Sequence, residues 1–299
     1  MMIKSVLIVG GGTAGWITAA YLARALEAQR PGWVHITLLD SAQFASPWLG
    51  EGTGPTIRNT LRHIGIDETR LVRACCTSFK QGTKFIHWRF PPGRGAPDHY
   101  LHPFQITKEP AGLDLISYWL LGVAGPNVNW DAVSTPQKRV ADSNRAPKLI
   151  HIPDYEAPLN YAYHFDSVKL AAFLRRRATA MGVLPLRDTL ERVNLTEDGS
   201  IRSVTARAGG DLHADLFIDC TGSRAQLIGA ALGAPYKSCG STLFCDTALA
   251  MQVPHEWPDS PIASCTIATA HDSGWISDIG LDCSRDLDED ATGGFERLE

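Results

Sequence analysis

The first forty residues show a short apolar run, a glycine-rich turn, a longer helix-forming stretch and a second apolar run. Ser5 to Val9 is rich in β-branched residues and lacks polar alternation, which is typical of a parallel strand buried on both faces. Ala14 to Ala28 contains Ala, Leu and Glu throughout and predicts a helix. Val34 to Leu39 predicts a second strand. This order of elements predicts an α/β domain with a parallel sheet.

The pattern from residue 166 onward predicts a second helix and then several short strands. Asp166 to Met181 places apolar side chains on one helical face, namely Val168, Ala171, Leu174, Ala178 and Met181. The strands are predicted at Val183 to Leu186, Glu191 to Leu195, Ile201 to Ala206 and Ala214 to Gly222, with a turn at Asp198-Gly199. We expect the apolar face of this helix to pack on a sheet.

The glycine-rich turn between the first strand and helix matches the spacing G-x-G-x-x-G. In Gly10-Gly11-Gly12-Thr13-Ala14-Gly15, the first glycine permits a tight turn, Gly12 lets the backbone approach a pyrophosphate, and Gly15 allows close helix–strand packing. The positive N-terminus of the helix then faces the phosphates. Asp40 follows the second strand, 25 residues after Gly15, where a carboxylate can accept hydrogen bonds from ribose hydroxyls. The sequence predicts a dinucleotide site, and the alternative is an ordinary glycine-rich turn followed by an unrelated acid.

Composition narrows the class of protein. The 299 residues are 44% hydrophobic and 20% charged, with a net charge of −4, so a large core is expected and nucleic-acid binding is not. The seven cysteines form no C-x-x-C pair and are interpreted as mostly reduced core residues of a cytoplasmic protein. No segment is apolar and long enough to cross a membrane, the opening run lacks the basic start of a secretory signal, and no metal site is predicted.

Further motifs point to the dinucleotide and to a family. A helix, hairpins and a strand ending in Asp219-Cys220-Thr221-Gly222 resemble the FAD modules of the glutathione-reductase type. From about Ile3 to Leu281 the chain also resembles the flavin-dependent tryptophan halogenases. The matching segments are GGGTAGW (10–16), GEGTGPTI (50–57), FKQGTKF (79–85), HPF (102–104), YHFD (163–166), LFIDCTG (216–222) and the stretch from Ala250 to Ile276.

The resemblance implies a fold and a reaction. The fold is an α/β FAD-binding module of the glutathione-reductase, Rossmann-like type with a substrate-side insertion. The expected divisions are 1–87 and 161–281 for the two parts of the module, 88–160 for the insertion and 282–299 for a divergent acidic tail. A separate flavin reductase supplies reduced FAD, which with oxygen oxidises a halide ion, and the hypohalous acid passes through an internal tunnel to a lysine. The substrate is tryptophan or a related indole-like aromatic.

The resemblance also assigns site residues. The lysine maps onto Lys80, whose amine can donate a hydrogen bond to hypohalous acid or form a haloamine. Besides the glycine turn and Asp40, the FAD is expected near Asp219 and Gly222, and beside the loop that carries Gly50 and Glu51. The substrate or tunnel is expected near His102, Trp275 and Ser277. For His102, a structural role is the open alternative.

Two departures from the family limit the functional interpretation. The family motif W-x-W-x-I-P reads Trp275-Ile276-Ser277-Asp278-Ile279-Gly280 here, so the second tryptophan is a serine. From Asp282 to Glu299 the chain carries seven acids and two bases in place of the family's continuation, which leads to the expectation of a truncated or frame-shifted chain. The alternatives are therefore a non-catalytic flavoprotein fragment and, because of Ser277, a flavin-dependent hydroxylase.

Overall fold

The computed structural model describes residues 3–41, 50–93, 98–257 and 259–282, which form two compact units. Of these residues, the first unit comprises 3–41, 63–65 and 167–250, and the second comprises 50–62, 66–93, 98–166, 251–257 and 259–282. The division of the sequence at residues 87, 160 and 281 stays a prediction. The acidic tail expected at 282–299 lies, apart from Asp282, outside the described residues.

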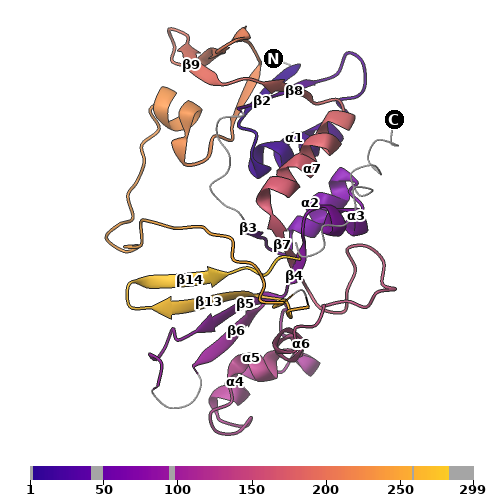
Figure 1. The fold of residues 1–299 in the computed structure, drawn as a ribbon, viewed down its shortest axis with the longest axis vertical. Coiled ribbons are helices and arrows are strands. Elements are labelled where there is room, and N and C mark those ends of the chain that lie inside the picture. Colours follow the sequence, from indigo (N-terminus) through magenta and orange to yellow (C-terminus); the bar gives the residue numbers. More distant parts are fainter. Residues whose placement is uncertain (1–2, 42–49, 94–97, 258, 283–299) are drawn as a thin grey trace. The chain divides into compact units, whose positions relative to one another are not determined.

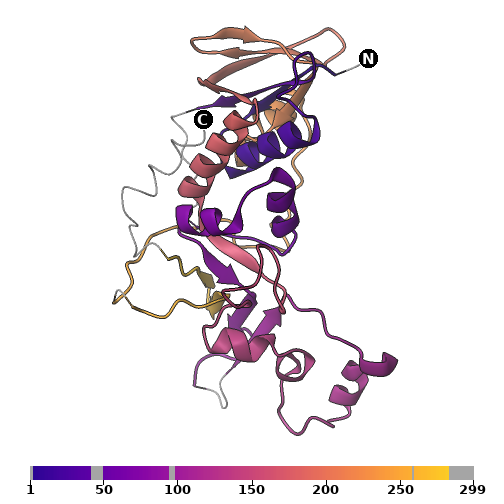
Figure 2. The same cartoon turned by 90° about the vertical axis from the view of Figure 1, so that its right-hand side faces the viewer.

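The first unit is built on a parallel sheet that confirms the predicted α/β fold. Its strand order is β12 (Leu216–Asp219), β1 (Ser5–Val9), β2 (His35–Asp40) and β8 (Leu184–Arg187), and all neighbours are parallel. Helices α1 (Thr13–Ala25) and α7 (Ser167–Ala180) pack against each other alongside this sheet (Figures 1 and 2). The apolar run of β1 is buried from Val6 to Val9, because both faces of the sheet are covered.

Helix α7 buries a different set of side chains from the one that the sequence predicted. Val168 is 57% exposed, whereas Leu170, Phe173, Leu174 and Ala178 are buried. Val168 lies two positions before Leu170, about 200° around an α-helix, so it projects from the opposite side. The predicted apolar stripe was therefore right at Leu174, Ala178 and Met181 and wrong at Val168.

A small antiparallel sheet completes the first unit. It has the order β11 (Gly210–Leu212), β10 (Ile201–Ala206) and β9 (Leu190–Leu195), and the turn between β9 and β10 contains Gly199 at a φ of +84°. Val204 and Ala206 of β10 pack with Leu7, Val9 and Leu39 of the parallel sheet, so the two sheets share one core. A 3-10 turn η2 (Gly222–Arg224) and a π-helical turn η3 (Gln226–Ala231) follow β12.

Two sheets form the second unit. A three-stranded antiparallel sheet has the order β3 (Gly50–Gly52), β7 (Ala162–Asp166) and β4 (Ser78–Lys80). A four-stranded sheet has the order β14 (Gly274–Asp278), β13 (Thr266–His271), β5 (Gly82–Ile86) and β6 (His99–Pro103), with only β13 and β5 parallel. The sequence predicted a loop at Gly50–Gly52, but these residues pair with β7 as a strand.

The segment from 88 to 160 contains short helices and one strand that no hydrophobic periodicity in the sequence predicted. Besides β6 it holds η1 (Pro110–Gly112), α4 (Leu115–Leu120), α5 (Trp130–Ser134) and α6 (Gln137–Asp142). Each helix is shorter than two turns, so no apolar period of 3.6 residues can develop. Helices α2 (Ile57–Ile64) and α3 (Glu68–Ala74) precede it, and Asp67 caps α3 by accepting a hydrogen bond from the amide of Arg70.

The described residues bear on three expectations from the sequence, concerning membrane spans, metal sites and cysteines. None of their helices is both long and apolar enough to span a bilayer. They also contain no cluster of three or more His, Cys, Asp or Glu side chains that would hold a metal ion. Cys75, Cys76 and Cys265 are buried, but Cys239 and Cys245 are exposed in the long connection between η3 and β13, so a core position holds for only some cysteines.

Candidate functional site

The three glycines of the predicted fingerprint have three different structural requirements. Gly10 adopts a φ of +118°, and a Cβ there would lie 2.2 Å from the carbonyl oxygen of Cys220. A Cβ on Gly15 would lie 1.8 Å from the carbonyl oxygen of Gly10, so helix α1 packs directly on the turn. Gly12 has an ordinary φ of −76°, and no heavy atom lies within 4 Å of its Cβ position. The structure thus uses Gly10 and Gly15 for its own packing and leaves the space over Gly12 open.

That open space lies at the N-terminus of α1. Gly12 is the N-cap and offers no side chain, and the first turn, which begins with Thr13 and Ala14, contains no acidic residue. A helix N-terminus without an acid attracts anions through its positive dipole end. The residues present therefore fit the pyrophosphate of a dinucleotide.

Asp40 ends β2 and lies directly over Gly11, which sequence reasoning gave no role. A Cβ on Gly11 would lie 1.8 Å from Oδ1 of Asp40, so only glycine leaves room for this carboxylate. Burial raises the pKa of Asp40, while Arg175 and Arg187 act in the opposite direction. Arg175 of α7 places its guanidinium 3.9 Å from Oδ2 of Asp40 and over the ring of Trp16. The carboxylate thus lies beside the glycine turn and pairs with an arginine that belongs to no sequence motif, and its contact with a ribose stays a prediction.

Asp219 and Gly222 lie at the same end of the parallel sheet as the glycine turn. Asp219 pairs with Val9 in the ladder of β12 and β1, immediately before Gly10. Its carboxylate accepts hydrogen bonds from the Thr221 amide and hydroxyl and from the amides of Leu227 and Ile228. Burial raises the pKa of Asp219, but these bonds outweigh it and lower the pKa overall. The structure shows Asp219 organising its own turn, and its contact with FAD stays a prediction.

Lys80 reaches across the three-stranded sheet of the second unit. Its strand partner on β7 is Ala162, yet its Nζ lies 3.1 Å from the Cβ position of Gly52 on β3, at the far side of β7. The small side chain of Ala162 and the missing side chain of Gly52 leave room for this path. The Nζ also lies 5.6 Å from the centre of the Phe104 ring. Burial lowers the pKa of Lys80, and Cys265 opposes this effect.

The strand register separates Glu51 from Lys80. Directly paired residues of an antiparallel ladder project from the same face, and neighbours along a strand alternate. Glu51 pairs with Phe165, whereas Gly52 pairs with His164 and Lys80 with Ala162. Glu51 therefore projects from the face opposite to Lys80. Gly50 lies near Ile279 and Leu281, and the flavin-side role predicted for Gly50 and Glu51 stays a prediction.

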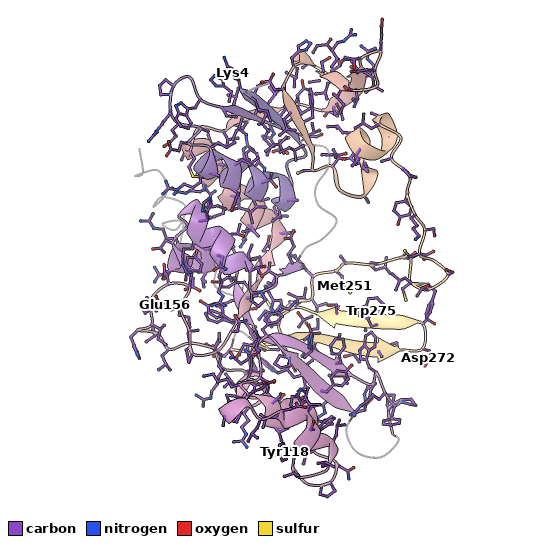
Figure 3. The ribbon with its side chains drawn as sticks, turned by 180° about the vertical axis from the view of Figure 1, so that it is seen from behind. Lys4, Tyr118, Glu156, Met251, Asp272 and Trp275 are labelled. Carbon is purple, nitrogen blue, oxygen red and sulfur yellow. The ribbon has the colours of Figure 1, made fainter. Side chains whose placement is uncertain are left out.

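The remaining predicted residues lie on the four-stranded sheet. Trp275 lies on the edge strand β14 (Figure 3), where it is 52% exposed and its ring is 6.0 Å from that of Trp88. Ser277 is two residues further along the same strand and therefore projects from the same face. His102 is exposed on β6 and lines a cavity of about 730 Å³. The aromatic residues around this cavity are Phe85, Tyr100, Phe104, Trp119 and Trp130. Phe104 belongs to this lining and also faces the amine of Lys80, so it links the cavity to the lysine.

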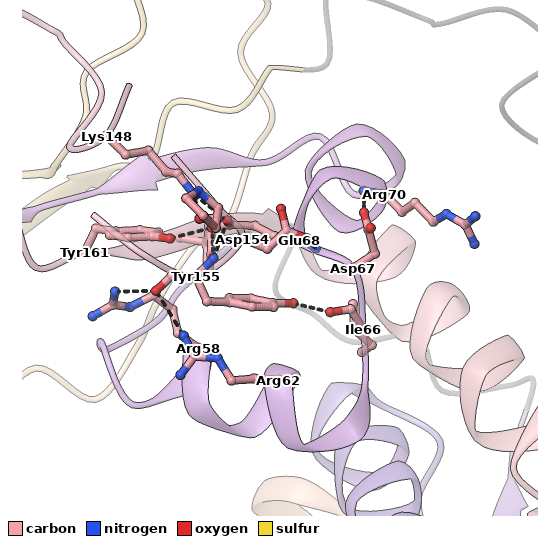
Figure 4. A network of polar contacts seen from close by, with 12 residues as sticks. Arg58, Arg62, Ile66, Asp67, Glu68, Arg70, Lys148, Asp154, Tyr155 and Tyr161 are labelled. Atoms are coloured by element: carbon pink, nitrogen blue, oxygen red, sulfur yellow. Dashed lines mark hydrogen bonds and ion pairs between the residues drawn. The ribbon is translucent and has the colours of Figure 1, made fainter. Parts of the chain in front are cut away.

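Sequence reasoning missed a buried carboxylate behind the lysine strand. Glu68 is 4% exposed and accepts hydrogen bonds from the hydroxyls of Tyr161 and Tyr163, from the amine of Lys148 and from the amide of Tyr155 (Figure 4). Phe79, next to Lys80, packs against the rings of Tyr161 and Tyr163. Glu68 stands in the first turn of a short helix, where an acid usually faces solvent, so the sequence carried no signal of its burial.

Comparison with known protein sequences assigns this chain to a family. The family model described as tryptophan halogenase matches residues 5–286. The chain is 37% identical over 292 residues to tryptophan 7-halogenase RebH of Lentzea aerocolonigenes, covering 93% of this chain and 54% of RebH. It is 34% identical over 295 residues to tryptophan 6-halogenase ThaL of Streptomyces albogriseolus, with 93% and 54% covered.

Solved structures give the same result. The crystal structure of a tryptophan halogenase from Shewanella frigidimarina superposes with a TM-score of 0.88 at 38% identity, over 98% of this chain and 59% of that one. The flavin-dependent tryptophan C-6 halogenase Tar14 from taromycin biosynthesis gives a TM-score of 0.84 at 36% identity, over 93% and 55%. The chain spans little more than half the length of these relatives. It belongs to the tryptophan halogenase family of flavin-dependent proteins.

Proposed function

We propose that this chain halogenates tryptophan or a related indole-like aromatic with reduced FAD, oxygen and a halide ion. The observation that carries the proposal is the environment of Lys80. Its amine is partly buried against Gly52 and Phe104, and within the described residues it forms no ion pair. An unpaired, partly desolvated lysine is typical of a reactive position rather than of a structural ion pair.

The cofactor would be held by the first unit. Gly10, Gly12 and Gly15 with the first turn of α1 would bind the pyrophosphate, Asp40 would accept from the ribose, and Asp219 and Gly222 would lie beside the same turn. When bound, reduced FAD supplies two of the four electrons that reduce oxygen to water, and the halide supplies the other two. The sequence has a single G-x-G-x-x-G, so we propose that a separate flavin reductase delivers reduced FAD.

Lys80 would act on the oxidised halogen. Its amine can donate a hydrogen bond to the oxygen of hypohalous acid, which polarises the halogen–oxygen bond toward the aromatic ring. The ring carbon then bonds to the halogen, the oxygen leaves as water, and the ring loses its proton. Since burial lowers the pKa of Lys80, the neutral amine is present at a lower pH than for an exposed lysine, which also permits a haloamine.

The aromatic substrate would bind in the cavity of the second unit. Aromatic side chains stack on an indole ring with about 0.5–1.5 kcal/mol per pair beyond buried area. Phe104 and His102 line this cavity, and Phe104 lies beside the lysine amine. A ring stacked there would approach the reactive amine.

Lys80→Ala is expected to abolish the halogenated product and to leave FAD binding unchanged, because the amine belongs to the second unit and the glycine turn and Asp40 belong to the first. The assay supplies tryptophan, bromide, FAD and an NADH-driven flavin reductase, and detects product by mass spectrometry. Lys84→Ala is the matched control and should retain product, since Lys84 lies on β5 of the other sheet and forms an ion pair with Asp142 of α6. Halogenated product from Lys80→Ala would contradict the proposal. A hydroxylated product from the unaltered chain would favour the hydroxylase reading suggested by Ser277.

A further inference from the structure

His164 is buried at the centre of the lysine-bearing sheet, and the mechanism above gives it no role. It is 0% exposed on the middle strand β7, and it projects from the same face as Ser78 and Gly52, its two strand partners. Its Nδ1 lies 3.1 Å from the hydroxyl of Ser78 on β4, and its Nε2 lies 2.8 Å from the hydroxyl of Thr266 on β13. One imidazole therefore joins the three-stranded sheet to the four-stranded sheet.

The hydrogen bonds around His164 determine its tautomer. The hydroxyl of Ser78 donates to the carbonyl oxygen of Gly280 at 2.5 Å, and a carbonyl cannot donate in return. The Ser78 oxygen must then accept from Nδ1–H, which leaves the Nε2 lone pair to accept from the hydroxyl of Thr266. This arrangement satisfies a neutral imidazole at both nitrogens without any charged partner.

The lysine amine and the imidazole meet at the same glycine. A Cβ on Gly52 would lie 3.1 Å from Lys80 Nζ, 3.4 Å from His164 Cδ2 and 3.6 Å from the Thr266 hydroxyl oxygen. The chain of Lys80 thus crosses β7 beside the imidazole. Through its two hydrogen bonds, His164 connects the sheet that contains Lys80 to strand β13 of the four-stranded sheet. Residues of the four-stranded sheet line the aromatic cavity, and Phe104 directly follows its strand β6.

We propose that His164 is a positioning residue for Lys80: a neutral imidazole, fixed between Ser78 and Thr266, that keeps the lysine amine in its buried position at Gly52 and sets its place relative to the aromatic cavity. The importance of that position for halogenation rests on the proposed function, whereas the position itself does not.

Electrostatics agree with a neutral imidazole. Burial lowers the pKa of His164 to about 3, and the nearby Lys80 adds to the effect. The titratable groups that face the lysine amine are His164 from β7 and Cys265 from the residue before β13, while Glu51 of β3 projects from the opposite face. Within the described residues, the lysine titration therefore depends chiefly on how well burial is maintained.

The matched pair Thr266→Val and Thr266→Ser tests the proposal. Valine keeps the shape of threonine without its hydroxyl, and serine keeps the hydroxyl. The pH dependence of Lys80 acetylation is measured by competitive labelling of the 299-residue chain and mass spectrometry of its peptides, with Lys4 and Lys84 as internal references. We expect the labelling midpoint of Lys80 to rise in Thr266→Val, so that the reactive fraction below the midpoint falls by about tenfold for each pH unit of change. Thr266→Ser should behave as the unaltered chain.

Two further variants keep the test decisive. Ser78→Ala breaks the other end of the link and should give the same rise, while His271→Gln, an exposed histidine on β13, should give none. An unchanged Lys80 midpoint in folded Thr266→Val and Ser78→Ala, or an equal change at Lys84, would overturn the positioning role. In the halogenation assay we expect kcat to fall about tenfold in Thr266→Val with KM unchanged, since the amine and not the cavity has moved. If the labelling midpoint of Lys80 rises but kcat is unchanged, His164 does position Lys80, but the position of Lys80 does not matter for halogenation.

Discussion

Gly12→Val is expected to weaken FAD binding strongly while leaving the folded chain intact. Nothing within 4 Å of the Gly12 Cβ position opposes a side chain, and its φ of −76° suits valine, so the protein itself tolerates the change. The isopropyl group would fill the space that the pyrophosphate needs at the N-terminus of α1. The loss is expected to be about 2–3 kcal/mol of binding, or roughly 30- to 150-fold in Kd. Flavin fluorescence titration measures it.

Gly15→Val is the matched contrast within the same motif. A Cβ at Gly15 would lie 1.8 Å from the Gly10 carbonyl oxygen, so this variant should lose stability in urea unfolding, whereas Gly12→Val should not. Equal FAD affinity of Gly12→Val and the unaltered chain would show that the phosphates do not approach this turn. A large loss of stability in Gly12→Val would show that the open space belongs to the fold.

Glu68→Gln is expected to lower the free energy of unfolding by about 3 kcal/mol or more, since Lys148 loses its buried charge partner and the donors at one of the two oxygens lose their acceptor. The carboxylate accepts from Tyr161, Tyr163, Lys148 and the amide of Tyr155, and a glutamine amide would turn an NH₂ group toward some of these donors. Urea unfolding measures the change. Glu191→Gln, an exposed glutamate on β9, is the control and should lie within about 0.5 kcal/mol of the unaltered chain.

The same carboxylate predicts a pH dependence. Burial alone would raise the pKa of Glu68, but its hydrogen bonds with Lys148, Tyr161, Tyr163 and the Tyr155 amide outweigh burial and lower it. A lowered pKa in the folded chain gives stabilisation that is fully present above the unfolded value of about 4.3 and is lost as pH falls through the folded value. The stability difference between the unaltered chain and Glu68→Gln should therefore shrink at acidic pH. A difference that stays constant down to pH 2 would contradict this linkage.

The parallel sheet and the glycine turn were predictable because local rules decide them. β1 is an uninterrupted apolar run, Gly10 needs a positive φ, and Gly15 needs close contact, and each requirement leaves a mark at one position of the sequence. The strand at Gly50–Gly52 was not predictable in this way. Three residues with two glycines resemble a loop, and only pairing with β7, more than 100 residues later, makes them a strand.

The candidate site shows the same division between local and long-range signals. Lys80 was found through a family motif, yet the path of its side chain depends on Ala162 and Gly52, which come from two other strands. Arg175, Glu68 and His164 carried no signal of their roles, because each contacts residues between 80 and 159 positions away that only the fold brings near. A single sequence indicates residues that need a particular backbone conformation, such as Gly10. It does not indicate a polar residue such as Glu68 or His164, whose role arises only from its burial in the fold.

The alternation along β7 has a practical consequence for protein engineering. Tyr163 and Phe165 project from one face of the strand, where Tyr163 bonds with Glu68, and Ala162 and His164 project from the other, where they border Lys80. Under the proposed function, the odd-numbered positions Tyr163 and Phe165 contribute only to packing, whereas the even-numbered positions Ala162 and His164 contribute to packing and also border the reactive amine. A directed-evolution library confined to Tyr163 and Phe165 would therefore vary stability without substituting a residue that borders Lys80.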